Sequence, residues 1–289
     1  MNEKELEAYL DQLRAMGMND QMVEMYKQQI MLANAMNEQL SDESGDDGDF
    51  LSDLFGDSYE VVLEPSTNLT LPQQWAVACG ADLAMLNGHA LNVVAFDEDE
   101  ETSREVLSEW WGIESKEELD EMIESLKAGR HSGYYSRIAD AYRQGSRGAA
   151  EQYINDNLAH LVDDVEDAID HYLNMREAMV HLETDYLIPR GGDVPNLIAW
   201  DLVRGINIAR IGVGAGYYAE EEALAIVMAL AKTLQKTYSS WKDLSVAYQL
   251  GRYIWGGDAQ YETMRDGMKV LLSDENSPWV KLAWDTKLG

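Results

Sequence analysis

Cysteine is almost absent from this 289-residue chain, in which Cys79 is the single one. One thiol excludes an intrachain disulfide, and it is too few for a structural zinc site. The neighbours of Cys79 are apolar, in the run Trp75-Ala76-Val77-Ala78. We therefore expect Cys79 to behave as a small buried hydrophobe rather than as a reactive thiol.

Long apolar runs are also lacking. No stretch reaches the roughly 20 apolar residues that a transmembrane helix needs. The N-terminus, Met1-Asn2-Glu3-Lys4-Glu5, lacks the basic region and the apolar run of a secretory signal. Together these features predict a cytoplasmic location.

Basic residues are scarce: 22 Lys and Arg stand against 53 Asp and Glu, a formal net charge of -31. Binding to nucleic acid phosphates or to anionic lipid depends on Lys and Arg, so the sequence predicts neither nucleic acid nor membrane as a partner. The charge favours a basic protein partner. An apolar content of 46% is typical of a globular protein.

The common catalytic motifs are missing. The chain has no Gly-x-Ser-x-Gly elbow and no Walker loop. Histidines and carboxylates share residues 160–171, but without the Glu-x-x-His pair of helical two-metal centres. The sequence therefore predicts no catalytic residue, no metal site and no cofactor.

What the chain has in abundance is helical spacing of apolar residues, which predicts a mainly α-helical fold with at most a small β element. Residues 1–40 are predicted to form a helical hairpin. Residues 41–58, which begin Ser-Asp-Glu-Ser-Gly-Asp-Asp-Gly-Asp, are predicted to be a flexible acidic linker. Residues 59–289 form the predicted multi-helix domain.

Within that domain, cap residues and apolar periodicity together set the predicted elements. Ser115 with Glu118 and Ser240 with Asp243 have the spacing of capping boxes. Residues 59–70 are predicted to be extended and 91–96 to form a strand. The predicted helices, after one that starts at Pro72, are 102–111, 115–129, 134–144, 149–187, 195–211, 219–237, 240–255 and 259–272.

The helix 195–211 is apolar over most of its circumference, which is typical of a buried helix. Polar side chains nevertheless recur along it three residues apart, and a charge in a core needs a counter-group. These polar side chains are called the polar ridge below. Either they pair with other groups of the protein, or the arginines among them line a pocket for an anionic group. An arginine in the aromatic stripe of 240–255 could complete such a pocket. The candidate ligand site is therefore Asp201, Arg204, Asn207, Arg210, Tyr248 and Arg252.

The glycine-rich run 212–216 follows this helix rather than a strand, so we interpret it as a helix C-cap with a flexible turn. A separate apolar stripe lies within the acidic linker. It either packs on its own domain or binds the groove of a partner protein. This candidate partner-binding stripe is Phe50, Leu51, Leu54 and Phe55.

Several motifs together resemble the bacterial family called domain of unknown function 1266 (DUF1266). They are Trp110-Trp111-Gly112-Ile113, Ala199-Trp200-Asp201-Leu202-Val203-Arg204 with Asn207, Arg210 and Gly212, Tyr217 with Glu221-Glu222-Ala223, Tyr238-Ser239-Ser240-Trp241, and Gly251-Arg252 with Trp255. The resemblance covers roughly residues 75–272. It implies a bacterial source and an α-rich fold, and it brings no established activity.

Three functional hypotheses follow from the sequence. The leading one is a non-enzymatic acidic interaction protein that neutralises a basic partner, such as a toxin in bacterial competition. The second is an enzyme or small-ligand binder that uses the 199–255 block. The third is an acidic mimic of nucleic acid, which needs carboxylates along one exposed face of a helix over 149–187.

Overall fold

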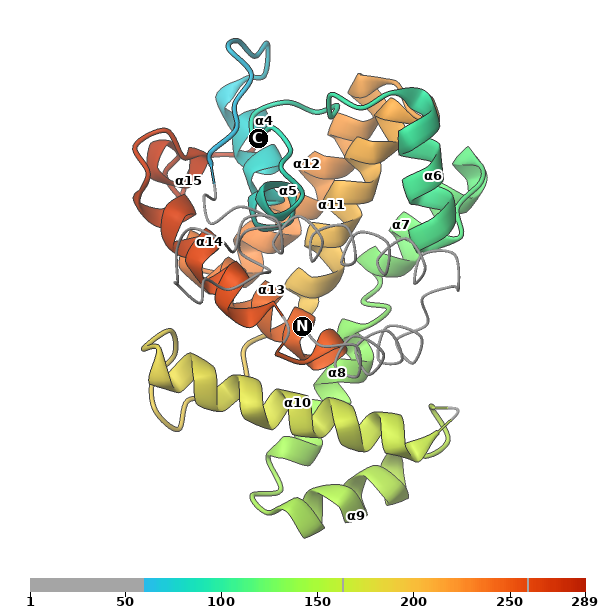
Figure 1. Ribbon diagram of the computed structural model, residues 1–289, viewed down its shortest axis with the longest axis vertical. Coiled ribbons are helices and arrows are strands. Elements are labelled where there is room, and N and C mark those ends of the chain that lie inside the picture. The colour runs from blue at the N-terminus through green and yellow to red at the C-terminus, as the bar shows by residue number, and fades with distance from the viewer. Residues whose placement is uncertain (1–59, 163, 259) are drawn as a thin grey trace, which may run out of the picture. The chain divides into compact units, whose positions relative to one another are not determined.

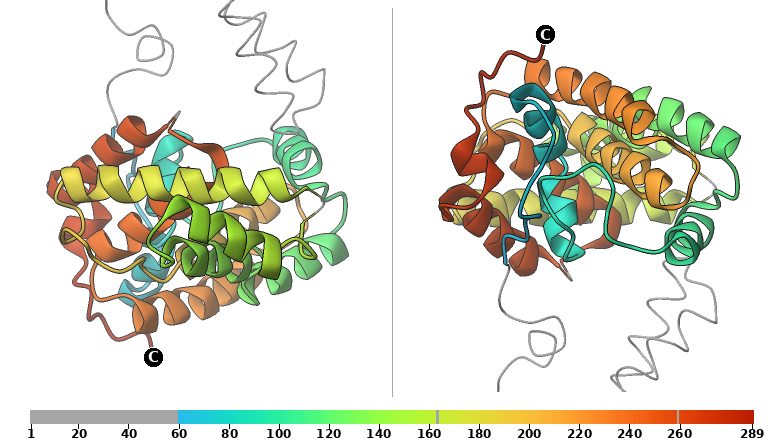
Figure 2. Two further views of the ribbon diagram at one scale, coloured as in Figure 1. Left: turned by 90° about the horizontal axis from the view of Figure 1, so that it is seen from below. Right: turned by 90° about the horizontal axis from the view of Figure 1, so that it is seen from above.

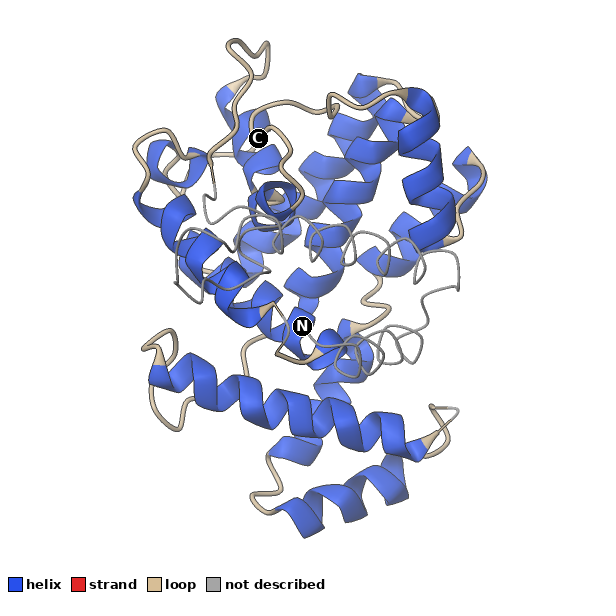
Figure 3. Cartoon of the chain, in the orientation of Figure 1, coloured by secondary structure: helices blue, strands red, loops and turns tan. Residues whose placement is uncertain are grey.

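The computed structural model describes residues 60–162, 164–258 and 260–289. Over these residues the chain is built of α-helices joined by loops and turns, and no strand occurs among them (Figure 3). The predicted mainly α-helical fold is confirmed. Among the described residues, no helix has the length and apolar character needed to cross a membrane.

Some predictions fall outside the described residues. These are the helical hairpin 1–40, the acidic linker 41–58 and the apolar stripe of Phe50, Leu51, Leu54 and Phe55. They stay predictions.

The helices follow one another with short connections, and several begin at a side chain that accepts a hydrogen bond from the first turn. Ser115 and Ser240 do so as predicted, accepting from the backbone N–H of Glu118 and Asp243. In chain order the helices are α4 (Leu71–Ala78), α5 (Ala81–Leu86), α6 (Glu100–Trp111), α7 (Lys116–Lys127), α8 (Ser132–Tyr142), α9 (Arg147–Asn157), α10 (Val165–Thr184), α11 (Ile198–Gly214), α12 (Glu220–Thr237), α13 (Trp241–Gly256), α14 (Tyr261–Ser273) and α15 (Pro278–Lys281).

Helix α11 is the centre of the described region. It packs against α5, α6, α7, α8, α12 and α13, and Figure 1 shows these helices around it. Of its 17 residues 13 are buried, so the prediction of a buried helix is confirmed. A helix enclosed on all sides must be apolar nearly all round, which is the pattern its sequence has.

Helices α8, α9 and α10 pack on one another beside this core. Helix α10 contacts both α8 and α13, and α9 lies against α8 and α10 (Figures 1 and 2). The prediction of one long helix over 149–187 is therefore wrong. The chain leaves helix after Asn157 and re-enters at Val165, where Asp164 accepts a hydrogen bond from Glu166 N–H. The turn lets α9 fold back, so the single acidic face that nucleic acid mimicry required does not form.

The prediction of a strand over 91–96 is also wrong. The backbone carbonyl groups of Ala90, Val93 and Val94 accept hydrogen bonds from the guanidinium of Arg210. Carbonyl groups that converge on one side chain are not free to form a ladder with a neighbouring strand. The loop thus wraps around a charge that lies 120 residues away from Ala90 in sequence.

The glycine-rich run lets three helices approach closely. Helix α11 continues through it to Gly214, and Gly216 then turns the chain with a φ of +74°. A Cβ at Gly212 would lie 2.5 Å from Leu119 Cδ2 of α7, and one at Gly214 would clash with Ser103 of α6. The run is thus a close-packing site as well as a helix end, and only glycine allows both contacts.

A cluster of tryptophan side chains packs the C-terminal residues against the core. Trp241 stacks on Trp279 with ring centroids 5.6 Å apart, and it contacts Trp75 at 4.7 Å and Trp284 at 4.9 Å. The indole N–H groups donate to backbone carbonyl groups, Trp241 to Leu282 at 2.9 Å among them. Each ring thus buries apolar area and satisfies its polar atom.

Replacing Trp241 by alanine should therefore lower the free energy of unfolding by about 3–5 kcal/mol, because it empties the centre of this cluster. Urea unfolding followed by circular dichroism measures the change. The control is Trp110→Ala, since the Trp110 side chain is 53% exposed and its loss opens no cavity. An equal loss of stability in both variants would contradict the packing described here.

Candidate functional site

The polar ridge of α11 is largely buried, as predicted, and its three ionised side chains divide between two clusters. Asp201 and Arg210 are 0% exposed and Asn207 is 4% exposed. Asp201 and Arg204 form the first cluster with residues of α8 and α6, whereas Arg210 forms the second with the loop that holds Ala90 and Val94.

The carboxylate of Asp201 caps helix α8, which has no capping side chain of its own. It accepts hydrogen bonds from Ser132 N–H at 2.7 Å and from His131 N–H at 3.1 Å. Helix N-termini leave such N–H groups without partners and attract negative charge. Burial raises the pKa of Asp201, but the bonds from His131 and Ser132 and the charge of Arg204 outweigh it, so the pKa lies below its usual value.

The guanidinium of Arg204 lies between two tryptophans, with Cζ 3.9 Å from the ring centroid of Trp200 and 5.4 Å from that of Trp111. Its Nε–H donates to the Trp200 carbonyl oxygen at 2.8 Å, and Nη2 donates to Asp201 at 3.2 Å. Aromatic faces and a carboxylate together replace the water that a cation loses on burial.

His131 joins these two charges at the edge of the cluster. Its Nδ1 lies 2.9 Å from Oδ1 of Asp201 and 2.8 Å from Nη2 of Arg204. One ring nitrogen can donate to the carboxylate or accept from the guanidinium, but it cannot do both at once. The His131 side chain is 31% exposed, whereas that of Asp201 is 0% exposed. Solvent therefore reaches the cluster of Asp201 and Arg204 mainly at His131.

Two nitrogens of Arg210 donate to backbone carbonyl groups, and its Nη1 has no hydrogen-bond partner among the described residues. Nη2 donates to Ala90 O at 2.7 Å and to Val93 O at 2.8 Å, Nε donates to Val94 O at 3.2 Å, and Cζ lies 4.0 Å over the ring of Phe96. Burial lowers the pKa of Arg210 to about 9, so the group is still a cation at neutral pH. Its charge is answered by carbonyl dipoles and an aromatic face.

The three remaining candidates are placed differently. Tyr248 is buried beside Trp200, with ring centroids 5.6 Å apart, and burial raises its pKa to about 12. Arg252 donates to Gln260 and lies 4.9 Å over Trp255, toward α14. The Oδ1 atom of Asn207 has no hydrogen-bond partner in the part of the chain that the structure describes. The structure thus brings Asp201 and Arg204 into contact, and it places Arg210 and Arg252 in separate surroundings.

Two polar residues that sequence reasoning missed lie close to these elements. His131 binds Asp201, and no pattern in the sequence links residues 70 positions apart. Asp82 is 8% exposed, with one oxygen bonded to Ser245 and the other without a hydrogen-bond partner among the residues that the structure describes. A signal for Asp82 did exist, because it is the only Asp, Glu, Lys or Arg between Glu64 and Asp97. Among the described residues, no cluster of three metal-ligating side chains occurs.

Removing the Asp201 carboxylate should leave two N–H groups of α8 and the Arg204 cation without their partner. Asp201→Ala is expected to cost about 3–5 kcal/mol of unfolding free energy, as for other buried pairs broken on one side. Glu121→Ala, at an exposed position of α7, is the matched control. Chemical denaturation measures both variants, and a loss below about 0.5 kcal/mol for Asp201→Ala, the scale of an ordinary surface substitution, would refute the role assigned to the carboxylate.

Asp82 predicts an unusual dependence of stability on pH. Burial raises its pKa from 3.8 to about 7, against the opposing effect of the Ser245 hydrogen bond. The folded state therefore holds a proton that the unfolded state has lost between these values. The unfolding free energy should fall as pH rises from about 4 to about 7, by up to about 4 kcal/mol from this group.

Asp82→Asn removes that titration, so the variant should gain stability over the parent as pH rises through this window. Thermal unfolding at pH 5 and pH 8 provides the comparison. Equal differences in Tm between the two proteins at both pH values would show that Asp82 ionises normally.

Comparison with known proteins extends this picture. Residues 106–284 match the family described as "Protein of unknown function (DUF1266)". The chain is 26% identical over 149 residues to the "Uncharacterized protein YbeR" of Escherichia coli (strain K12). That alignment covers 52% of this chain and 56% of the relative, so it spans about half of each. No solved structure matches. The resemblance seen in the sequence is confirmed, and the chain belongs to the DUF1266 family.

Proposed function

We propose that this protein is a non-catalytic, acidic protein-binding module that neutralises a basic protein partner, such as a basic toxin. The binding surface is assigned to residues 97–124, which comprise α6, α7 and the loops beside them and are called the acidic segment below. The supporting observation is that acidic residues far outnumber basic ones in this segment, and that most of its carboxylates have no neighbouring cation among the described residues.

The acidic segment contains 13 carboxylates and two basic residues, Arg104 and Lys116, in 28 positions. All the carboxylates except that of Glu98 belong to exposed residues. They are Asp97, Glu98, Asp99, Glu100, Glu101, Glu105, Glu109, Glu114, Glu117, Glu118, Asp120, Glu121 and Glu124.

Both basic residues of the segment are already engaged. Arg104 donates to the Ala215 carbonyl oxygen at 2.9 Å and pairs with Glu100 at 2.7 Å. Lys116 pairs with Glu222 of α12. Most of the carboxylates therefore face solvent without a neighbouring cation, and a field of one sign attracts a partner of the opposite sign.

The spacing of the acids raises the free energy of the isolated protein. Glu101, Glu105 and Glu109 follow one another at i, i+4 on α6, where like charges repel by about 0.2–0.5 kcal/mol per pair. Basic groups of a partner would relieve this repulsion on binding. The repulsion between these carboxylates destabilises the free protein and would be relieved in a complex. This difference favours a role in binding a partner over a role in keeping the protein hydrated.

An aromatic anchor lies among these acids. Trp110, at the end of α6, is 53% exposed, next to Glu109 in the chain. Tryptophan is over-represented among residues that dominate binding energy, and its ring attracts lysine and arginine. The segment also has a firm base, because Leu107 and Leu119 are fully buried and α6 and α7 both pack on α11.

The alternative, an enzyme or small-ligand binder that uses Asp201, Arg204, Asn207, Arg210, Tyr248 and Arg252, has less support. Arg210 donates three hydrogen bonds to backbone carbonyl groups and is 0% exposed. Asp201 caps α8 and also bonds Arg204. The atoms that these groups leave without a hydrogen-bond partner among the described residues, Nη1 of Arg210 and Oδ1 of Asn207, are buried and so out of reach of a guest molecule.

A matched pair of charge-reversal variants tests the proposal. Glu105→Lys, Glu109→Lys and Glu117→Lys together alter the acidic segment, whereas Glu166→Lys, Asp170→Lys and Glu177→Lys make the same change in net charge at exposed positions of α10. The full-length proteins are immobilised and used to capture binding proteins from the native host at physiological salt. The parent and the α10 variant should retain the same basic protein, and the acidic-segment variant should lose it.

Trp110→Ala adds a second arm, because loss of the anchor should weaken capture while net charge is unchanged. Retention of that protein by the acidic-segment variant would disprove the assignment. Capture of neutral or acidic proteins alone would disprove the chemistry of the partner.

A further inference from the structure

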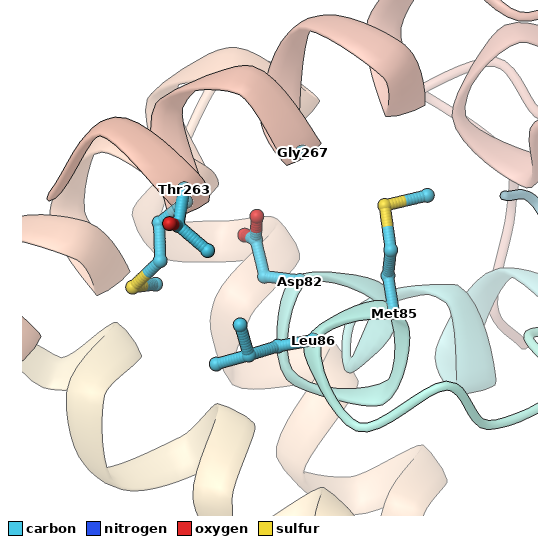
Figure 4. A pocket seen from close by; sticks show the side chains of 6 residues that line it. Asp82, Met85, Leu86, Thr263 and Gly267 are labelled. Atoms are coloured by element: carbon cyan, nitrogen blue, oxygen red, sulfur yellow. The ribbon is translucent and has the colours of Figure 1, made fainter. Parts of the chain in front are cut away.

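A small hollow lies between α5 and α14, away from the helices that carry the acidic segment. Figure 4 shows the carboxylate of Asp82 rising from α5 toward α14, with the side chains of Met85 and Leu86 on either side of it. The hollow has room for a group of about the size of a water molecule. Its lining residues are Asp82, Met85, Leu86, Thr263, Met264 and Gly267.

Asp82 is an acceptor that the protein only partly satisfies. Its Oδ1 accepts from Ser245 Oγ–H at 2.9 Å, and that hydroxyl oxygen accepts from Gln249 Nε2 at 3.0 Å. The other oxygen, Oδ2, is buried, and none of residues 60–162, 164–258 and 260–289 forms a hydrogen bond with it. A buried carboxylate in this condition is stabilised by a proton, by a cation or by a bound water molecule, and of these a cation also compensates the charge of the ionised form. Burial raises its pKa to about 7, which agrees with a site that exchanges one for the other near neutral pH.

The other lining groups indicate which kind of cation fits. A divalent metal ion takes six or more oxygen ligands, but the side chains that line the hollow offer one carboxylate and the Thr263 hydroxyl group, and the others are methionine and leucine. The planar guanidinium group is too large for a space of one water molecule. An ammonium head is of the right size, carries three donors for Oδ2 and its neighbours, and leaves its alkyl stem to contact apolar walls.

The apolar walls also suit a stem rather than a bare ion. Met85 and Met264 have flexible, polarisable side chains that adjust to the shape of a guest. Gly267 places no side chain over the hollow from α14.

We propose that the hollow between α5 and α14 binds a primary ammonium group carried on an unbranched alkyl stem, with Asp82 as its counter-ion. This site is separate from the acidic segment and does not depend on the function proposed above. A small free amine and a lysine side chain both present this chemistry. Tests on both sources distinguish them.

The experiment is an NMR chemical-shift titration of the full-length protein at pH 8. The probes are n-butylammonium chloride and Nα-acetyl-lysine N-methylamide. n-Butanol has the same stem without the charge, and tetramethylammonium has the charge without N–H donors. Both primary ammonium probes should shift resonances of α5 and α14, and neither comparison compound should do so. Binding of one probe alone still supports the site and identifies its source as a free amine or a lysine side chain.

Three variants locate the binding. Asp82→Asn keeps the shape of the side chain and should weaken binding by about tenfold or more, the usual effect of losing a charged partner. Gly267→Ala adds a methyl group at the lining of the hollow and should weaken binding without loss of fold. Glu121→Gln, at an exposed acid of α7, should leave the titration unchanged.

Two results would overturn the proposal. One is the absence of saturable shifts with both primary ammonium probes. The other is equal affinity in the parent and in Asp82→Asn, which would place any binding elsewhere on the acidic surface.

Discussion

The described structure depends on how ionised side chains are accommodated in its most buried helix. Asp201, Arg204 and Arg210 lie on α11, which is enclosed by six other helices, and two of the three are 0% exposed. An isolated charge in such a place would cost several kcal/mol, so the surrounding chain has to be arranged around each one. The start of α8 lies at Asp201, the loop with Ala90 and Val94 wraps Arg210, and Trp111 covers Arg204.

These interactions join segments that are far apart in sequence, and the three ionised side chains lie inside the region that identifies the family. Asp201, Arg204 and Arg210 all fall within residues 106–284, the range of the family match. Each of these residues organises a different part of the fold. The surface charge is a separate matter, since all the carboxylates of the acidic segment except that of Glu98 belong to exposed residues, whereas its Leu107 and Leu119 pack in the core.

The sequence predicted local features well and long-range ones poorly. The helices that begin at Ser115 and Ser240 were predictable because the cap residue and its partner are three positions apart. The burial of α11 was predictable because it leaves a periodic apolar pattern. The break at residues 158–164 was missed, because neither Gly nor Pro marks it and the cap Asp164 looks like one more acid on an acidic helix.

The strand expected over 91–96 shows most clearly where prediction from local sequence fails. Its apolar residues do suit a strand, but the carbonyl groups around it bind Arg210, and nothing local reveals that. The same holds for the candidate site. The ridge on α11 was visible from spacing, whereas its partner His131 is neutral in the formal count and lies 70 residues away. Asp82 was detectable as a lone charge in an apolar stretch, but its role depends on a hydroxyl group 163 residues further on.

The most direct test of this account is hydrogen exchange at the arginine Nε–H groups, followed by ¹⁵N NMR of the full-length protein in deuterated buffer. Nε–H of Arg210 donates to Val94, and that of Arg204 donates to Trp200. Both signals should persist as long as the backbone amides in the middle of α11, because exchange then requires the core to open. Loss of both signals as fast as that of an exposed arginine would contradict the claim that the protein itself answers these charges.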